Sequence, residues 1–146
     1  MSQVDFYVID GAGELTRRRF ACRLAEKAYR LKNTVHIHAS DRQSVEQIDE
    51  LLWTFRDGSF LPHDVHDASN PLPVAPITVG CETAPADDRD LLINLSDEIP
   101  PIAGSFPRVA EIVTADEDAK SRSRRRFVDY RDQGHTLDTH KLHGRS

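Results

Sequence analysis

The stretch VDFYVIDGAG, residues 4–13, decides the fold class of this chain. It is apolar almost without interruption after Phe6, which is typical of a strand covered by other elements on both faces. The turn Gly11-Ala12-Gly13 follows, and residues 14–32 then place apolar side chains at helical spacing, with Asn33 as the expected cap. A strand, a turn and a helix in this order predict the first unit of an α/β fold.

Beyond this unit, the chain continues to alternate between short apolar strands and amphipathic helices. One further helix is expected to begin at the capping box Ser40-x-x-Gln43 and to end at Gly58, and a last helix is expected over residues 116–134. This alternation predicts a three-layer α/β sandwich with a mostly parallel sheet. The further strands are predicted at residues 34–39, 77–79, 91–95 and 111–113.

Three segments between these elements are predicted to be short or irregular. Several prolines restrict the residues before them, so residues 66–76 are expected to form a loop. A short extended segment is expected within 59–65, and a short helical turn within 106–110.

Length and cysteine content indicate one stable domain. At 146 residues the chain matches a single domain over 1–146, with an ordered core at about 4–142, and can bury a core without disulfides or metals. Cys22 and Cys81 are isolated in the sequence, which fits a reducing compartment. Because neither a signal-peptide pattern nor a membrane-spanning apolar run is present, we expect a cytoplasmic protein.

Charge is concentrated in one segment of the chain. The formal net charge is −5, yet residues 120–131 hold six Lys or Arg residues against the single acid Asp129. This segment therefore carries +5 and the rest of the chain −10. Such asymmetry favours a localised site for an acidic partner on a body that repels bulk nucleic acid.

The glycine turn after the first strand is compatible with dinucleotide binding, because glycines let a backbone approach a pyrophosphate. The third glycine of that fingerprint is missing, since Thr16 stands in its place, and no Gly-x-x-x-x-Gly-Lys-Ser/Thr loop exists. The sequence therefore favours a tight turn at Gly11-Ala12-Gly13.

Metal binding and hydrolysis have no positive support in the sequence. A metal site can be drawn from His36, His38, His63 and His66, but only if all four histidines converge in the fold. No Gly-x-Ser-x-Gly elbow is present for a hydrolase. We expect neither a metal, nor a cofactor, nor catalytic residues.

The predicted last helix carries a mixed stripe of cations and apolar side chains. Lys120, Arg124, Val128 and Arg131 fall at i, i+4, i+8 and i+11 and so share one stripe. Phe127 and Tyr130 lie at its edge, and Tyr130 is expected to face the core. For Lys120 and Arg124, a solvated face and an anion site are both open at this point.

Aromatic side chains are densest between Leu51 and His63. Trp53 fits a core position on a helix, but Phe55, Phe60 and Leu61 are harder to bury together with it. An exposed aromatic cluster beside a proline is typical of a protein–protein interface.

The order of several segments resembles the chi subunit of bacterial DNA polymerase III. The resemblance spans about residues 4–142, and its most specific part is the Leu-Trp pair followed by Ser-Phe-Leu-Pro-His. It implies a Rossmann-like nucleotide-binding topology without a phosphate loop. The matching segments are VDFYV at 4–8, CRLAEKA at 22–28, IDELLW at 48–53, SFLPH at 59–63, DLLINL at 90–95, VAEIV at 109–113 and FVDYRDQG at 127–134.

The resemblance also implies a function and two partners. It implies a non-catalytic accessory subunit in DNA replication, within a complex that is itself the nucleotidyltransferase. The partners are the psi subunit, which links chi to the clamp loader, and the acidic C-terminal tail of single-stranded DNA-binding protein. That tail ends in an apolar residue and a free carboxylate.

Site residues follow by position from the same resemblance. For the tail they are Lys120, Arg124, Phe127, Val128 and Arg131. Phe127 stands where the family pattern has tyrosine, and Val128 where it has lysine; Arg125, Arg126 and Arg131 are candidates to replace the missing charge. For psi, or for a helicase that uses the same surface, they are Trp53, Phe60, Leu61 and Pro62.

Two alternatives of other classes stay open on the sequence. One is a nucleotide-dependent enzyme that uses the turn Gly11-Ala12-Gly13. The other is direct binding of single-stranded DNA through the basic last helix, which predicts a steep salt dependence.

Overall fold

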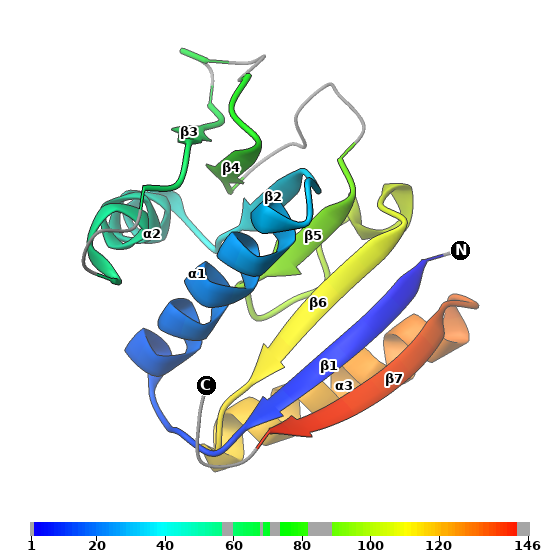
Figure 1. The fold of residues 1–146 in the computed structure, drawn as a ribbon. Helices are drawn as coiled ribbons and strands as arrows, with labels where there is room; N and C mark the ends of the chain where they lie inside the picture. Colours follow the sequence, from blue (N-terminus) through cyan, green and yellow to red (C-terminus); the bar gives the residue numbers. More distant parts are fainter. Residues whose placement is uncertain (1, 57–59, 68, 71–73, 82–88, 143–146) are drawn as a thin grey trace.

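The chain forms one seven-stranded, all-parallel sheet in the order β3-β4-β2-β5-β6-β1-β7 (Figure 1). This computed structural model describes residues 2–56, 60–67, 69–70, 74–81 and 89–142. The elements are β1 (Gln3–Ile9), α1 (Glu14–Arg30), β2 (Val35–His38), α2 (Arg42–Thr54), β3 (His63–Val65), β4 (Ile77–Gly80), β5 (Leu91–Asn94), the 3₁₀ turn η1 (Ala103–Ser105), β6 (Arg108–Val113), α3 (Glu117–Asp132) and β7 (Thr136–Leu142).

Helices cover both faces of the sheet, as the predicted three-layer sandwich requires. α1 and α2 lie on one face and α3 lies on the other (Figure 1). A large apolar cluster joins α1 and α2 to the sheet, and a smaller one joins α3 and the η1 segment to β1 and β6. β1 serves both layers, because Val4 and Phe6 face α3 while Ile9 packs in the α1 layer.

The turn after β1 needs both of its glycines for reasons of geometry. Gly13 has φ 92°, which disfavours a residue with a side chain, and it begins α1. A Cβ atom on Gly11 would lie 2.6 Å from Cγ2 of Thr16. The tight turn that the sequence favoured is therefore confirmed.

Helix ends differ in detail from the predicted caps. Asp41, and not Ser40, caps α2, since its Oδ1 accepts the Ser44 N–H at 2.8 Å. α1 ends in a Schellman motif with Lys32 in the left-handed region at φ 65°, so Asn33 is not the capping residue. α2 ends at Thr54, and Gly58 lies outside the described residues.

The C-terminal third holds the two larger corrections. The helical turn expected within 106–110 is wrong: η1 ends at Ser105, and β6 already begins at Arg108. β7 was not predicted at all. Its sequence TLDTHKL alternates without a continuous apolar run, because it is an edge strand with most of its residues exposed.

Candidate functional site

A pocket of about 300 Å³ lies between α3 and the sheet. Its floor is apolar, since Phe6 and Val8 come from β1 and Val113 from β6. Thr139 of β7 closes one side. The wall that α3 supplies consists of Ser123, Arg124, Phe127 and Val128.

The α3 wall contains three of the five residues predicted for an acidic tail. Arg124 is exposed, Val128 is 41% exposed, and the half-buried Phe127 ring lies 5.4 Å from the Phe6 ring. Lys120 and Arg131 stand on the same helix without lining the pocket. An apolar floor beside one exposed guanidinium suits an apolar group that carries a carboxylate.

α3 is fixed to the sheet by a buried polar network around Glu111 of β6. The Glu111 carboxylate is fully buried and accepts hydrogen bonds from Arg126 Nε at 3.0 Å and Tyr130 Oη at 2.7 Å. Asn94 Nδ2 donates to it at 2.8 Å. Burial, and then the charge of Glu111, raise the pKa of Tyr130. The core-facing position of Tyr130 is confirmed.

This network decides which arginines face solvent. Arg126 is 5% exposed and paired with Glu111, so it cannot replace the charge missing at Val128. Arg125 and Arg131 are exposed, and Arg131 lies 3.7 Å from Asp132. Only the exposed arginines remain candidates for that role.

The aromatic surface, which we define as Trp53, Phe60 and Pro62, lies at the end of α2. Trp53 is 49% and Phe60 69% exposed, with ring centroids 5.7 Å apart, and Pro62 is half-buried. Leu61 is only 3% exposed and belongs to the core below α2. The prediction that Leu61 is offered to a partner is therefore wrong, because its side chain is buried while that of Phe60 beside it is exposed.

His63 supports this aromatic surface from below. Its side chain is fully buried, and its ring centroid lies 4.5 Å from that of Trp53. Nδ1 lies 2.7 Å from the Leu61 carbonyl oxygen. Nε2 lies 3.1 Å from Asp49 Oδ1, close enough for an ion pair but without hydrogen-bond geometry. His63 therefore contacts both α2, through Asp49 and Trp53, and the segment before β3, through Leu61.

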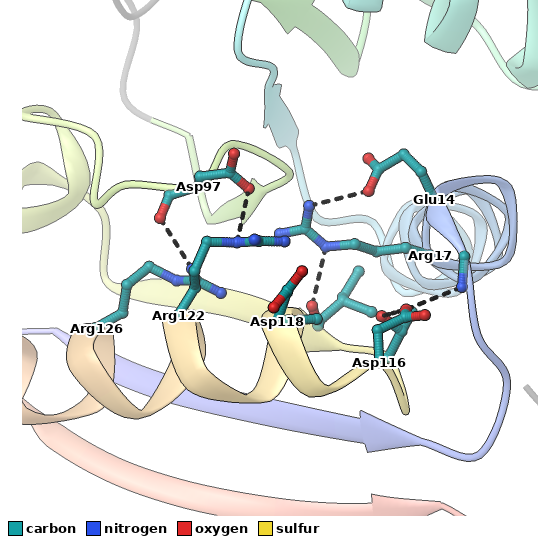
Figure 2. A pocket seen from close by; sticks show the side chains of 11 residues that line it. Glu14, Arg17, Asp97, Asp116, Asp118, Arg122 and Arg126 are labelled. Carbon is teal, nitrogen blue, oxygen red and sulfur yellow. Dashed lines mark hydrogen bonds and ion pairs between the residues drawn. The ribbon is translucent and has the colours of Figure 1, made fainter.

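At the carboxyl ends of the strands, where Rossmann-like folds bind nucleotides, the chain's own charged side chains line and partly fill a cavity (Figure 2). Arg17 reaches across it, and its Nε and Nη1 each donate at 3.0 Å to the carbonyl oxygens of Ile112 and Leu95. Asp116 Oδ2 accepts the Gly13 N–H at 3.0 Å and the Thr114 hydroxyl at 2.7 Å. These two donors lower the pKa of Asp116.

The cavity at the carboxyl ends of the strands has a volume of about 310 Å³ and is unsuited to phosphate. The Asp116 carboxylate already accepts the Gly13 N–H at the start of α1, where a bound phosphate would otherwise do so. Further carboxylates line the cavity, so a phosphate would meet like charge. The lining acids are Glu14, Asp97, Asp116 and Asp118, and the lining bases are Arg17, Arg122 and Arg126.

Comparison with known proteins identifies the family. The family described as DNA polymerase III chi subunit, HolC, matches residues 1–138. This chain belongs to the DNA polymerase III chi subunit family. It is 41% identical to the DNA polymerase III subunit chi of Pseudomonas aeruginosa over 142 residues, 97% of this chain and 98% of that protein.

Two further relatives of this chi-family chain carry the same name. The Haemophilus influenzae protein is 32% identical over 139 residues, 94% of this chain and 95% of that protein. The Escherichia coli protein is 27% identical over 144 residues, 95% of this chain and 97% of that protein. All three relatives are named as the chi subunit and not as a catalytic subunit.

Solved structures that resemble the chi-family fold include helicase domains. A DEAD box protein from Methanococcus jannaschii superposes with a TM-score of 0.57 at 12% identity over 93% of this chain. Dbp5 of S. cerevisiae, bound to RNA and ADP, gives 0.60 at 6% identity over 96%. The chi-family chain spans only 40% and 41% of those proteins, and the likeness shows the fold alone.

The four histidines that were considered as metal ligands do not converge on one point in this chi-family chain. His36 and His66 lie with ring centroids 6.0 Å apart, whereas His63 packs on Trp53. Burial lowers the pKa of His36 to about 3, and its Nδ1 bonds to the Thr78 hydroxyl at 2.7 Å. Among the described residues, no group of three or more His, Cys, Asp or Glu side chains could hold a metal.

Several residues of the chi-family pocket could not be recognised from the sequence. Phe6, Val8 and Val113 look like ordinary core residues of strands, and Thr139 lies in the strand that was not predicted. None of the helices in the described part of the chain has both the length and the apolarity needed to cross a bilayer.

Proposed function

We propose that this protein is a non-catalytic, cytoplasmic accessory subunit that joins two partners during DNA replication. One partner is the psi subunit of the clamp loader, and the other is the acidic C-terminal tail of single-stranded DNA-binding protein. Nucleic acid is reached only through that second protein. The observation that carries the proposal is the apolar pocket of about 300 Å³ with Arg124 in its wall.

In this proposal, the pocket under α3 takes the end of the tail. Its apolar terminal residue packs on Phe6, Val113 and Phe127, and its terminal carboxylate pairs with Arg124. An arginine can hold a carboxylate through two parallel hydrogen bonds. The preceding acids of the tail are attracted by Lys120 and Arg131 on the same helix.

The psi subunit occupies the aromatic surface. Trp53 and Phe60 expose a contiguous pair of rings, and such rings are enriched at the energetic centres of interfaces. Because His63 and Asp49 hold the pair from beneath, the surface is pre-organised for a partner.

Both partners fit at the same time. The aromatic surface belongs to α2 and the segment before β3, at one edge of the sheet (Figure 1). The pocket belongs to α3 and β7, at the other edge and on the opposite face (Figure 1). A bridging subunit requires two such separate surfaces.

The test of the tail site is a calorimetric titration with a short acidic peptide that ends in phenylalanine. Arg124→Ala should weaken binding by about 1.5–3 kcal/mol, the value of a hydrogen bond to a charged group. Arg122→Ala is the matched control, since Arg122 is exposed on the same helix, pairs with Asp97 and does not line the pocket. It should have a much smaller effect.

A second peptide with an amidated C-terminus tests the carboxylate directly. We expect it to bind more weakly to the unmodified protein and to be insensitive to Arg124→Ala. Equal binding of the free and amidated peptides would contradict the proposed site.

A further inference from the structure

β7 forms a long, regular outer edge of the sheet. All seven of its residues pair in continuous register with Gln3–Ile9 of β1. In the part of the chain that the structure describes, no strand pairs with its outer side. The opposite edge strand, β3, has only three residues. Long regular edges without proline or bulge accept an additional strand readily.

The backbone groups on the free side of β7 can be assigned from two hydrogen bonds. The Thr136 N–H donates to the Ser2 carbonyl at 3.1 Å, whereas the Gln3 N–H donates toward β6, to Pro107 O at 3.0 Å. Alternate residues of a parallel strand bond to opposite neighbours. The outward N–H and C=O groups of β7 therefore belong to Leu137, Thr139 and Lys141.

This free edge is continuous with the pocket under α3. Leu137, Thr139 and Lys141 pair with Val4, Phe6 and Val8, whose side chains face α3. Thr139 itself lines the pocket. A chain end seated in the pocket therefore places its preceding residues beside the outward backbone groups of β7.

We propose that the acidic tail binds as an added strand on β7, with its last side chain in the pocket. This inference rests on the proposed function and specifies how the same site holds its ligand. Backbone hydrogen bonds to the outward groups of β7 align the tail. The site thereby recognises the extended backbone of the tail as well as its terminal carboxylate and apolar side chain.

Charge on this edge suits an acidic strand. Lys141 is exposed and lies on the pocket side of the sheet, near the end of β1. The one acid of β7, Asp138, lies on the opposite side and accepts a hydrogen bond from Gln3 Nε2 at 2.8 Å. On β7 itself, an acidic chain on the pocket side therefore meets a lysine and not a carboxylate.

A second copy of the chain fits this edge less well. Its β7 has no Phe, Tyr or Trp to fill the pocket. The extended acidic peptide satisfies the backbone edge, the apolar floor and the guanidinium together.

The experiment is a scan of the acidic, phenylalanine-ended peptide with one N-methyl group moved along its backbone. Strand addition predicts a period of two: methylation at alternate residues weakens binding about tenfold, because a hydrogen bond is lost and the methyl group clashes. Methylation at the intervening residues, whose N–H groups face solvent, has little effect.

A matched pair of protein variants tests the other side of the contact. Thr139→Pro removes an outward N–H but no bond to β1, so the sheet tolerates it. Thr139→Val keeps the N–H and removes only the hydroxyl. Because Thr139 lines the pocket, the valine variant measures the effect of the side chain, and we expect the proline variant to bind the peptide about fivefold or more weakly than the valine variant, with circular dichroism unchanged.

The outcomes separate the two ideas. A peptide that binds with no alternation in the scan overturns strand addition while the tail site stands. A peptide that does not bind at all overturns both. Dimerisation of the free protein that Thr139→Pro abolishes would assign the edge to a second copy and overturn the inference as well.

Discussion

Two cavities of nearly equal volume, about 310 and 300 Å³, flank α3 on two sides, and they differ in how their polar groups are satisfied. In the cavity at the carboxyl ends of the strands, Arg17 and Asp116 already form hydrogen bonds with backbone groups of the chain. In the pocket above β1, Arg124 is exposed beside an apolar floor. The volume of a cavity alone does not identify a binding site. A charged side chain that faces solvent beside an apolar floor is the better indicator.

The 310 Å³ cavity lies where Rossmann-like folds bind nucleotides, and the chain's own charged groups take the positions that a phosphate would use. The first helix still begins at a glycine turn, but a carboxylate from the loop after β6 takes the place of a phosphate. A guanidinium fills the space between β5 and β6.

The largest expected effect concerns the network that fixes α3 between the two cavities. Glu111→Gln leaves the buried Arg126 guanidinium without its counter-charge, so we expect a loss of about 3–5 kcal/mol in the free energy of unfolding. Urea denaturation measures it. Arg122→Gln is the control: it breaks an exposed pair with Asp97 and should cost less than about 1 kcal/mol. Equal costs would mean that the network is not what holds α3.

Arg17→Met should lower the free energy of unfolding by about 2–3 kcal/mol, because the carbonyl groups of Leu95 and Ile112 lose a buried donor. Binding of the acidic peptide should be unchanged, since Arg17 does not line the pocket. Arg19→Met, at an exposed position of α1, is the matched control for stability. An Arg17→Met variant with unchanged stability would contradict the structural role of Arg17 in its cavity.

The buried histidine of β2 predicts a dependence of stability on pH. The folded-state pKa of His36 is about 3, below its ordinary 6.5, because the ring is buried. The unfolded chain therefore takes up a proton as pH falls below 6.5, and the stability that is fully present above this pH declines toward pH 3.

At about pH 5 this amounts to about 2 kcal/mol relative to neutral pH. Urea denaturation across this range should show the slope. His36→Gln, which can keep the bond to Thr78, should be less stable at neutral pH but show a shallower slope. An unchanged slope would contradict the assignment to His36.

Val128→Lys restores the residue type that the family pattern has beside Arg124. We expect a gain of about 1 kcal/mol in peptide affinity at low salt, most of it lost at high salt, because the new charge is exposed. Val128→Gln controls for side-chain length without charge. No gain at low salt would place the acids of the peptide away from this face of α3.

The sandwich could be predicted from the sequence because β5 and the second half of β1 are apolar runs, β2 alternates, and α1 and α2 have clear periodicity. β7 could not, because an edge strand needs no apolar run and TLDTHKL has none. The short helical turn expected within 106–110 is wrong because β6 begins at Arg108, and its first residues, Arg-Val-Ala-Glu, contain no apolar run.

Less of the site could be predicted than of the fold. Lys120 and Arg124 stand out as cations at helical spacing, but the pocket floor is made of strand residues with no motif of their own. Leu61 was misplaced because its neighbours Phe60 and Pro62 lie nearer the surface, and only its burial in the structure shows that it belongs to the core. Arg17 gave no signal, since its partners are backbone carbonyls distant in the sequence.

The most direct test is an amide NMR titration of the ¹⁵N-labelled protein with the acidic, phenylalanine-ended peptide. The proposed site predicts that the largest shift changes occur at Val113, Phe127 and Thr139 around the pocket. Largest changes at Gly13, Arg17 and Thr114, around the cavity at the carboxyl ends of the strands, would contradict it.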